Sequence, residues 1–347
     1  MLGLKASDSA VVSARLSASV IDKAKGCIIG ALLGDATGAP LEFTHDLSKE
    51  KIQDAMELKG GGVFRVAPGQ VTDDGELSMC VLNGLAKCKL GYDPNVICLE
   101  YGRWISSNPF DIGTTTRTAL TEARKAGPEL SKRVSKAALE MAHSISNGST
   151  MKLSPTAAYG SFLPLEKMLE VVETETRHVH QNQNVLDCNI GFALAIRTLI
   201  HGGTPEQAYA AQAEFIKISS IADWLRELEE GNLQPPNRKI GWVKIAYQQA
   251  FLHLRKKTPF SDALRAVVSQ GGDTDTNVCI VGMLLGARDG LSNLDQNLVG
   301  KLLSCNTNLG QPRPEFLHTN LGIHSLIDQM LENALIFADN LAIPTAK

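Results

Sequence analysis

Apolar positions follow a helical period along most of the chain. Between residues 260 and 268, Phe260, Ala263, Leu264 and Val267 recur with the three- and four-residue spacing of one helix face. The same pattern predicts helices at roughly 94–107, 113–126, 131–143, 161–174, 184–201, 204–230, 241–256 and 321–340. Alternating strand patterns are nearly absent, and no internal repeat or interdomain linker is evident. We therefore predict a compact all-α fold, with one domain over residues 21–347.

Two further apolar runs, one starting at Ile21 and one after Asp275, carry glycines at every fourth residue. A glycine costs a helix about 1 kcal/mol relative to alanine, so such a stripe favours close approach of another helix. We expect these two helices to pack against each other through Gly26, Gly30, Gly34, Gly38, Gly282 and Gly286. The segment from Lys59 to Val71 is rich in glycine and has no helical period, which predicts a loop.

The composition of the 347 residues is that of a globular protein, with 44% apolar residues, 20% charged residues and a net charge of −3. This charge gives no indication of a nucleic-acid surface, and no apolar run is long enough for a membrane span, so we expect neither partner. The seven cysteines form no C-x-x-C pair and predict reduced core residues in a cytoplasmic protein. Residues 1–20 are rich in Ser and Ala, which predicts an extension outside the main fold or an arm that docks on a partner.

Acidic residues gather at two predicted helix starts. Asp273 and Asp275 follow a glycine pair, and Asp73 and Asp74 follow Thr72 at the end of the loop. Asp and Thr cap helices, and the helix dipole favours an anion by roughly 0.3–1 kcal/mol. Two carboxylates about 4 Å apart repel by about 4 kcal/mol at an effective dielectric near 20, and a hard cation would relieve that repulsion. Oxygen donors without nearby Cys or His favour Mg²⁺, Mn²⁺ or Ca²⁺ over zinc, with a capping turn as the alternative.

Several short motifs also follow one another in a fixed order. They are spread over residues 21–290 and occupy residues 26–35, 42–43, 60–64, 68–69, 72–74, 110–115, 147–151, 180, 187–188, 241–243 and 271–276. This order resembles that of the ADP-ribosylglycohydrolase family. The resemblance implies a compact all-α fold with a two-metal centre, in a cleft that binds ADP-ribose.

The resemblance also implies roles for the matched positions. Two divalent cations, Mg²⁺ or Mn²⁺, are expected on Thr72, Asp73, Asp74, Asp273, Asp275 and Thr276. Glu42 and Asp111 are the expected carboxylates for catalysis, with Asp74 or an activated water as the alternative, and acid and base are not assigned between them. The expected substrate contacts are Gly113, Thr114, Asn147, Gly148, Ser149, Met151, His180, Trp242, Gly271 and Gly272.

The implied reaction is hydrolysis of the bond that joins C1″ of ADP-ribose to a protein side chain, for which we expect arginine. The implied partner is an ADP-ribosylated protein and, if the protein confers immunity, a cognate ADP-ribosyltransferase toxin. One alternative is a catalytically silent relative that binds ADP-ribose or a protein, although all six inferred ligands are present. A phosphatase that uses an Asp-x-Asp nucleophile is disfavoured, because residues 273–275 follow a predicted helix and not a buried strand.

Two places depart from the family pattern. Gly75 stands where many relatives have Thr after the Asp pair, so we expect a different ligand geometry or helix cap there. Arg177 and Val179 flank the histidine region without the usual Thr-His order, which weakens the assignment of His180. A lone histidine or tryptophan, such as Trp242, is more often a structural residue.

Overall fold

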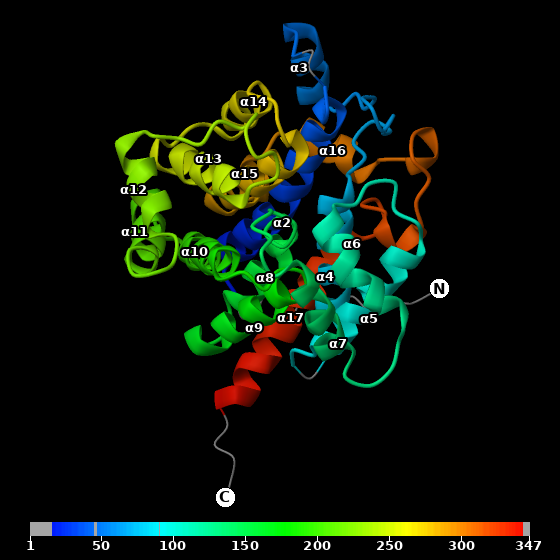
Figure 1. Ribbon diagram of the computed structural model, residues 1–347, viewed down its shortest axis with the longest axis vertical. Helices are drawn as coiled ribbons and strands as arrows, with labels where there is room; N and C mark the ends of the chain where they lie inside the picture. The colour runs from blue at the N-terminus through cyan, green and yellow to red at the C-terminus, as the bar shows by residue number, and fades with distance from the viewer. Residues whose placement is uncertain (1–15, 45–46, 90, 343–347) are drawn as a thin grey trace, which may run out of the picture.

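The structure is a computed structural model that describes residues 16–44, 47–89 and 91–342. Helices follow one another along this span (Figure 1), and the described residues contain no β-strand, which confirms the all-α prediction. The α-helices are α2 (Ala18–Gly38), α3 (Lys49–Met56), α4 (Asp73–Lys87), α5 (Pro94–Ser106), α6 (Thr114–Leu120), α7 (Leu130–Ala137), α8 (Leu153–Gly160), α9 (Leu165–Arg177), α10 (Gln183–Ile200), α11 (Pro205–Ile216), α12 (Ala222–Glu230), α13 (Val243–Arg255), α14 (Phe260–Val268), α15 (Thr274–Asp289), α16 (Gln296–Leu303) and α17 (Ile323–Ala342). The short 3₁₀ turns are η1 (Ala39–Leu41), η2 (Thr121–Arg124), η3 (Ala138–Met141), η4 (Leu291–Asn293), η5 (Thr307–Leu309) and η6 (Glu315–Leu317).

The single helix predicted over residues 204–230 is wrong, because α11 and α12 are separate helices. Asp187 of α10 accepts hydrogen bonds from the backbone N–H of Ser220 at 2.8 Å and from its hydroxyl at 2.7 Å. These bonds hold a turn between the two helices. The apolar period also did not predict α3, α8 and α16, each only 8 residues long, because so few residues carry no clear period.

Helices α2 and α15 pack side by side at the centre of the molecule (Figure 1). A Cβ atom at Gly30 would lie 2.4 Å from the carbonyl oxygen of Gly282, and one at Gly286 would lie 2.0 Å from that of Gly26. Backbone therefore contacts backbone, which confirms the predicted glycine packing. A Cβ at Gly38 would lie 2.3 Å from the Cα of Asp275, so the end of α2 meets the start of α15.

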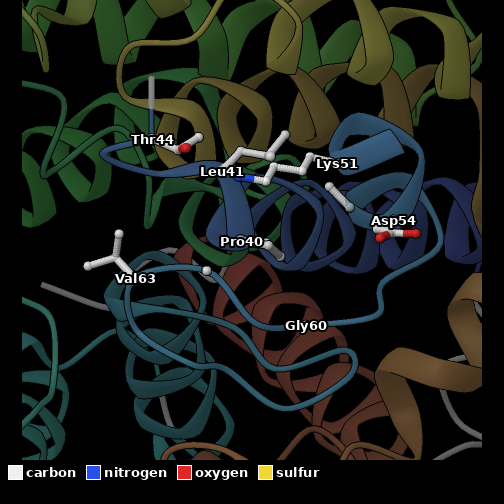
Figure 2. A pocket seen from close by; sticks show the side chains of 9 residues that line it. Pro40, Leu41, Thr44, Lys51, Asp54, Gly60 and Val63 are labelled. Carbon is white, nitrogen blue, oxygen red and sulfur yellow. The ribbon is translucent and has the colours of Figure 1, made fainter. Parts of the chain in front are cut away.

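The glycine-rich segment between α3 and α4 is a loop, as predicted. Gly61 and Val66 form an isolated antiparallel bridge across a tight turn. A Cβ at Gly62 would lie 2.5 Å from the carbonyl oxygen of Pro40, so this turn packs directly on η1. Figure 2 shows the turn beside Pro40, with a hollow between it and α3.

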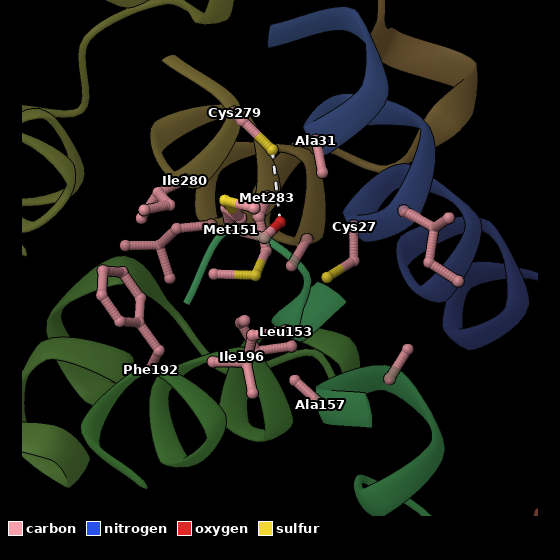
Figure 3. Close-up of a cluster of buried hydrophobic side chains, with 14 of the residues drawn as sticks. Cys27, Ala31, Met151, Leu153, Ala157, Phe192, Ile196, Cys279, Ile280 and Met283 are labelled. Carbon is pink, nitrogen blue, oxygen red and sulfur yellow. Dashed lines mark hydrogen bonds between the residues drawn. The ribbon is translucent and has the colours of Figure 1, made fainter. Parts of the chain in front are cut away.

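A buried apolar cluster lies between α2, α8, α10 and α15 (Figure 3). It includes the side chain of Met151, whose carbonyl oxygen is 3.4 Å from Cys279 Sγ and 3.4 Å from Ser78 Oγ. These contacts hold the turn that precedes α8 against α4 and α15. All the cysteines of the chain are free and buried, as the sequence predicts.

At the N-terminus, Ser17 caps α2, and its hydroxyl accepts from the backbone N–H of Val20 at 3.3 Å. Residues 18–20 therefore belong to α2, whereas residues 1–15 of the predicted extension lie outside the described residues. None of the described helices has the length and apolarity needed to cross a lipid bilayer.

Candidate active site

Helices α4 and α15 begin at the same place, which brings the two acidic clusters together. Thr72 Oγ1, just before α4, lies 3.2 Å from Asp74 Oδ2 and 3.2 Å from Asp275 Oδ2. Thr276 Oγ1 lies 3.3 Å from Asp74 Oδ2. Both helices point their N-termini at these carboxylates, where the helix dipole favours negative charge.

Asp35, near the end of α2, joins this cluster although the sequence did not indicate it as a site residue. Its carboxylate accepts from the backbone N–H of Thr72 at 3.0 Å, from the Thr72 hydroxyl at 2.9 Å and from the Gly75 N–H at 2.7 Å. Asp35 therefore caps α4. A Cβ at residue 75 would lie 2.7 Å from Asp35 Oδ2, so glycine at this position leaves room for the cap.

The carboxylates form two groups that share one member. Asp35, Asp74 and Asp275 each place an oxygen within 4.8 Å of the other two, and Glu42, Asp111 and Asp275 do the same. Asp275 is the shared member, so its carboxylate joins the two groups. Glu42 follows η1, and Asp111 lies in the connection between α5 and α6.

Crowding of these carboxylates in a buried place disfavours their charged forms. Burial, and after it the neighbouring carboxylates, raise the pKa values of Asp73, Asp74, Asp275 and Glu42 well above the usual range. Burial raises the pKa of Asp35 to about 7, although hydrogen bonds from Thr72 and Gly75 lower it.

Two oxygens of this cluster, Glu42 Oε2 and Asp74 Oδ1, are buried without a hydrogen-bond partner among the described residues. Unpaired buried oxygens and an oxygen-only donor set fit hard divalent cations such as Mg²⁺ or Mn²⁺.

A cavity of about 340 Å³ opens above the cluster. Five carboxylates line it, and no Lys, Arg or His is among the described residues of its wall. Its lining includes Glu42, Asp73, Asp111, Asp273, Asp275 and Thr276 together with the predicted contacts Gly113, Thr114, Asn147, Gly148 and Met151. Thr72 and Asp74 are fully buried beneath this lining. The cavity wall is thus rich in carboxyl groups that have no cationic side chain beside them among the described lining residues.

Asn147 fixes one carboxylate of the cavity wall. Its side-chain amide donates to Asp273 Oδ2 at 2.7 Å, and its backbone N–H donates to the carbonyl oxygen of Gly241 at 3.0 Å. The side-chain amide of Asn147 therefore orients the Asp273 carboxylate. Together with the backbone bond to Gly241, it connects three loops around the cavity.

His180 and Ser149 do not line the cavity, although the sequence predicted both as substrate contacts. His180 is buried, and its Nε2 lies 2.9 Å from the hydroxyl of Ser146, which does line the cavity. Burial lowers the pKa of His180 to about 3, so its ring is neutral. The ring contacts the cavity wall at the hydroxyl of Ser146. The Ser149 hydroxyl accepts instead from the Asn189 amide at 3.2 Å.

Trp242, Gly271 and Gly272 also lie off the cavity wall. The Trp242 ring packs edge-on against Trp224 at 5.8 Å between centroids, and Lys239 Nζ lies 4.6 Å from the Trp242 centroid. Gly271 and Gly272 have φ values of 71° and 85°, which shape the turn into α15. Trp242 also forms an isolated bridge with Ser146, which lines the cavity.

Several cavity residues were not predicted from the sequence, among them Phe43, Ile112, Thr115, Thr116, Ser146, Ile240 and Gly241. Phe43 and Ile240 are each 60% exposed although both are large and apolar. Phe43, Ile112, Thr115 and Gly241 lie within the matched motifs 42–43, 110–115 and 241–243, which was the available signal for them.

Comparison with known proteins gives a consistent result. A family model described as ADP-ribosylglycohydrolase matches residues 16–332. The chain is 28% identical over 288 residues to the ADP-ribosyl-dinitrogen-reductase glycohydrolase of Rhodospirillum rubrum, covering 82% of this chain and 91% of the relative. It is 26% identical over 292 residues to the ADP-ribosylarginine hydrolase Tri1 of Serratia proteamaculans, covering 82% of this chain and 76% of the relative.

A solved structure, described as an ADP-ribosylglycohydrolase-related protein complex, has the same fold. Its TM-score is 0.68 at 23% sequence identity, and the match covers 92% of this chain and 99% of that chain.

Proposed function

The chain belongs to the ADP-ribosylglycohydrolase family, and from this premise we propose that it hydrolyses the bond between ADP-ribose and a protein side chain. The observation that carries this proposal is the convergence of two carboxylate groups that share Asp275: Glu42 and Asp111 line the cavity with it, and Asp35 and Asp74 are fully buried. The names of two relatives, an arginine hydrolase and a dinitrogen-reductase glycohydrolase, support arginine as the acceptor.

We infer that Thr72, Asp73, Asp74, Asp273, Asp275 and Thr276 hold two divalent cations. The five carboxylates of the wall have no cationic side chain beside them among the described lining residues, and ADP-ribose would add two more negative charges. Two divalent cations would offset most of this charge. When bound, they would supply electrostatic stabilisation and orientation of the ribose hydroxyls.

The side chains around them divide the remaining work. Glu42 and Asp111 share a group with Asp275, which suits one carboxyl to protonate the leaving nitrogen and the other to accept a proton from water. The Asn147 amide holds Asp273 in one orientation. Backbone N–H groups and hydroxyls of the segments 113–116 and 146–148 are the donors available to the diphosphate, since no Lys or Arg lies among the described lining residues.

Release of ADP-ribose tests the proposal. Proteins modified on arginine and on serine are incubated with the wild type, with Asp273→Ala and with Asp262→Asn, which alters an exposed acid of α14. We expect release from the arginine substrate with Mg²⁺ or Mn²⁺, none with chelator, and loss only in Asp273→Ala. Binding of ADP-ribose without release from either substrate would instead support the catalytically silent alternative.

The role against an ADP-ribosyltransferase toxin, with residues 1–20 as a docking arm, stays a separate proposal. Because Ser17 caps α2, the suitable deletion removes residues 1–15 and leaves the cap in place. Unchanged affinity of this truncated protein for every cognate transferase would exclude the docking arm.

A further inference from the structure

Three phenylalanine rings form a row that begins at Phe43 in the cavity wall. The centroids of Phe43 and Phe64 are 6.0 Å apart at an interplanar angle of 71°, and those of Phe64 and Phe110 are 5.6 Å apart at 63°. Arg313, which also pairs with buried Glu76, lies 5.9 Å from the centroid of Phe110. The row is therefore in contact with Arg313 at Phe110 and exposed at Phe43, which lines the cavity.

Phe43 adopts an uncommon backbone conformation in the cavity wall. Its φ is 54°, in the left-handed region that a bulky side chain rarely adopts. The ring is nevertheless 60% exposed. A large apolar side chain held exposed by such a backbone, next to Glu42, is typical of a contact surface and not of packing.

The turn that carries Phe43 separates the cavity from a second hollow. Glu42 and Phe43 line the cavity, whereas Pro40, Leu41 and Thr44 line a neighbouring hollow of about 410 Å³. Figure 2 shows this hollow between α3 and the turn that carries Gly60 and Val63. Val63 is 61% exposed at its edge. The hollow therefore lies on the other side of this turn from the cavity, and its lining combines apolar Leu41, Ala55 and Val63 with charged Lys51 and Asp54.

We propose that Phe43 is a specificity-determining residue that receives the guanidinium group of an ADP-ribosylated arginine, and that the hollow beyond it receives the adjoining polypeptide. This inference rests on the proposed function. A guanidinium keeps its positive charge when linked to ADP-ribose, stacks on aromatic faces and can donate to the carboxyl groups of Glu42 and Asp111, which line the cavity and are not among the proposed metal ligands. An O-linked serine carries no charge and gains neither interaction.

Kinetics with two acceptors test the role of Phe43. Phe43→Leu keeps an apolar side chain and requires the same positive φ of 54°, but it removes the aromatic ring. We expect it to lower kcat/KM for an arginine-modified peptide roughly 5- to 30-fold, and that for a serine-modified peptide of the same sequence less than about 2-fold. Phe43→Tyr should keep the arginine-over-serine ratio. Ile218→Ala, which alters an 88% exposed side chain between α11 and α12, serves as the control for exposed apolar surface.

Binding of free ADP-ribose completes this test, because ADP-ribose lacks an acceptor. If the wild type cleaves only the arginine peptide, a lower kcat/KM for that peptide in Phe43→Leu, together with an unchanged Kd for ADP-ribose, still supports the acceptor role. The proposal would be overturned if Phe43→Leu weakened ADP-ribose binding as much as it lowered kcat/KM for the arginine peptide. It would also be overturned if kcat/KM for the arginine peptide did not change. Failure of the wild type to release ADP-ribose from any substrate would instead refute the proposed function.

The hollow is tested with substrates of different size. Val63→Trp narrows the edge of the hollow and should lower kcat/KM for a modified protein by about 5-fold or more. The same variant should change kcat/KM for ADP-ribosyl-agmatine, which has no polypeptide, less than about 2-fold. Equal effects on both substrates would exclude the hollow as a polypeptide site.

Discussion

The side-chain amide of Asn147 donates to Asp273 Oδ2 at 2.7 Å, which joins the turn before α8 to the start of α15. A carboxylate proposed to bind a cation is thus oriented by a neutral group that does not compete for the cation. Outer residues of this kind fix the geometry of metal ligands in many proteins.

Replacing Asn147 by Ala should weaken binding of the cations while the fold is kept. Loss of such a partner typically costs about 10- to 100-fold in metal affinity or activity. We expect the Mg²⁺ or Mn²⁺ concentration for half-maximal ADP-ribose release to rise by that factor. Asn297→Ala, at an exposed position of α16, is the control. An unchanged metal dependence would show that Asp273 needs no orienting partner.

The metal-free protein should lose stability as the pH rises. The pKa of Asp35 is raised by burial from 3.8 to about 7, so the folded state holds a proton that the unfolded chain releases. The contribution of Asp35 to the free energy of unfolding is full below about pH 4 and is lost as the pH rises toward 7. The pKa values of Asp73, Asp74 and Asp275 are also raised, so these residues change the stability in the same direction.

Thermal unfolding from pH 5 to pH 8 measures this effect. With chelator, Tm should fall across the range, and Mg²⁺ or Mn²⁺ should reduce or reverse the fall because bound cations displace the protons. A Tm that rises with pH in chelator would contradict the prediction.

Gly30→Ala should severely destabilise the fold. The new Cβ would lie 2.4 Å from the carbonyl oxygen of Gly282, so α2 and α15 would have to separate. We expect a loss of more than about 3 kcal/mol in the free energy of unfolding, measured by urea denaturation. Gly300→Ala is the matched control, because its Cβ meets nothing within 4 Å in the helix α16, and it should stabilise by about 0.5–1 kcal/mol. Similar values for both variants would refute close packing of the two helices.

Lys152→Met should also destabilise the fold, because it leaves the buried carboxylate of Glu175 without its lysine partner. Lys152 Nζ lies 3.1 Å from the carbonyl oxygen of Glu175 and 3.6 Å from Glu175 Oε2, and both side chains are at most 2% exposed. Removing one partner of a buried pair typically costs about 3–5 kcal/mol. Lys87→Met, at a pair whose lysine is 49% exposed, should cost less than about 1 kcal/mol in the same denaturation experiment.

The stability of the wild type at acid pH provides a second measurement on the same pair. Burial alone would raise the pKa of Glu175, but His178, Lys152 and the Tyr92 hydroxyl lower it to about 2. The contribution of Glu175 is present above its unfolded pKa near 4.5 and is lost as the pH falls toward 2. In Lys152→Met, the free energy of unfolding should decrease less as the pH falls than it does in the wild type. The same decrease in both proteins would contradict a stabilising Lys152–Glu175 pair.

The sequence predicted those features that depend on neighbouring residues in the chain. A helical period needs only residues three and four apart, and the glycine spacing indicated the packing of α2 on α15 because a repeated glycine has few other causes. Asp73 and Asp275 stood out because each begins an apolar helix next to another acid.

The remaining features depend on contacts between distant residues. Asp35 ends the matched motif 26–35, but it accepts from Thr72 and Gly75, which are 37 and 40 residues away, so its place in the acidic cluster depends on distant contacts. The turn between α11 and α12 depends on Asp187, 33 residues before Ser220. The sequence also could not distinguish Ser146, which lines the cavity, from His180 behind it.

The pairing of α2 with α15 has a consequence for synthesis of the protein on the ribosome. The hydroxyl of Thr274 at the start of α15 donates to the carbonyl oxygen of Gly38 across 236 residues of sequence. At about 5–20 residues per second, the nascent chain waits roughly 10–50 s between translation of α2 and translation of its partner. During this time the face of α2 that packs on α15 in the folded protein has no partner. The two acidic clusters meet only when α15 has been made, and chains that end before α15 therefore lack the proposed metal site.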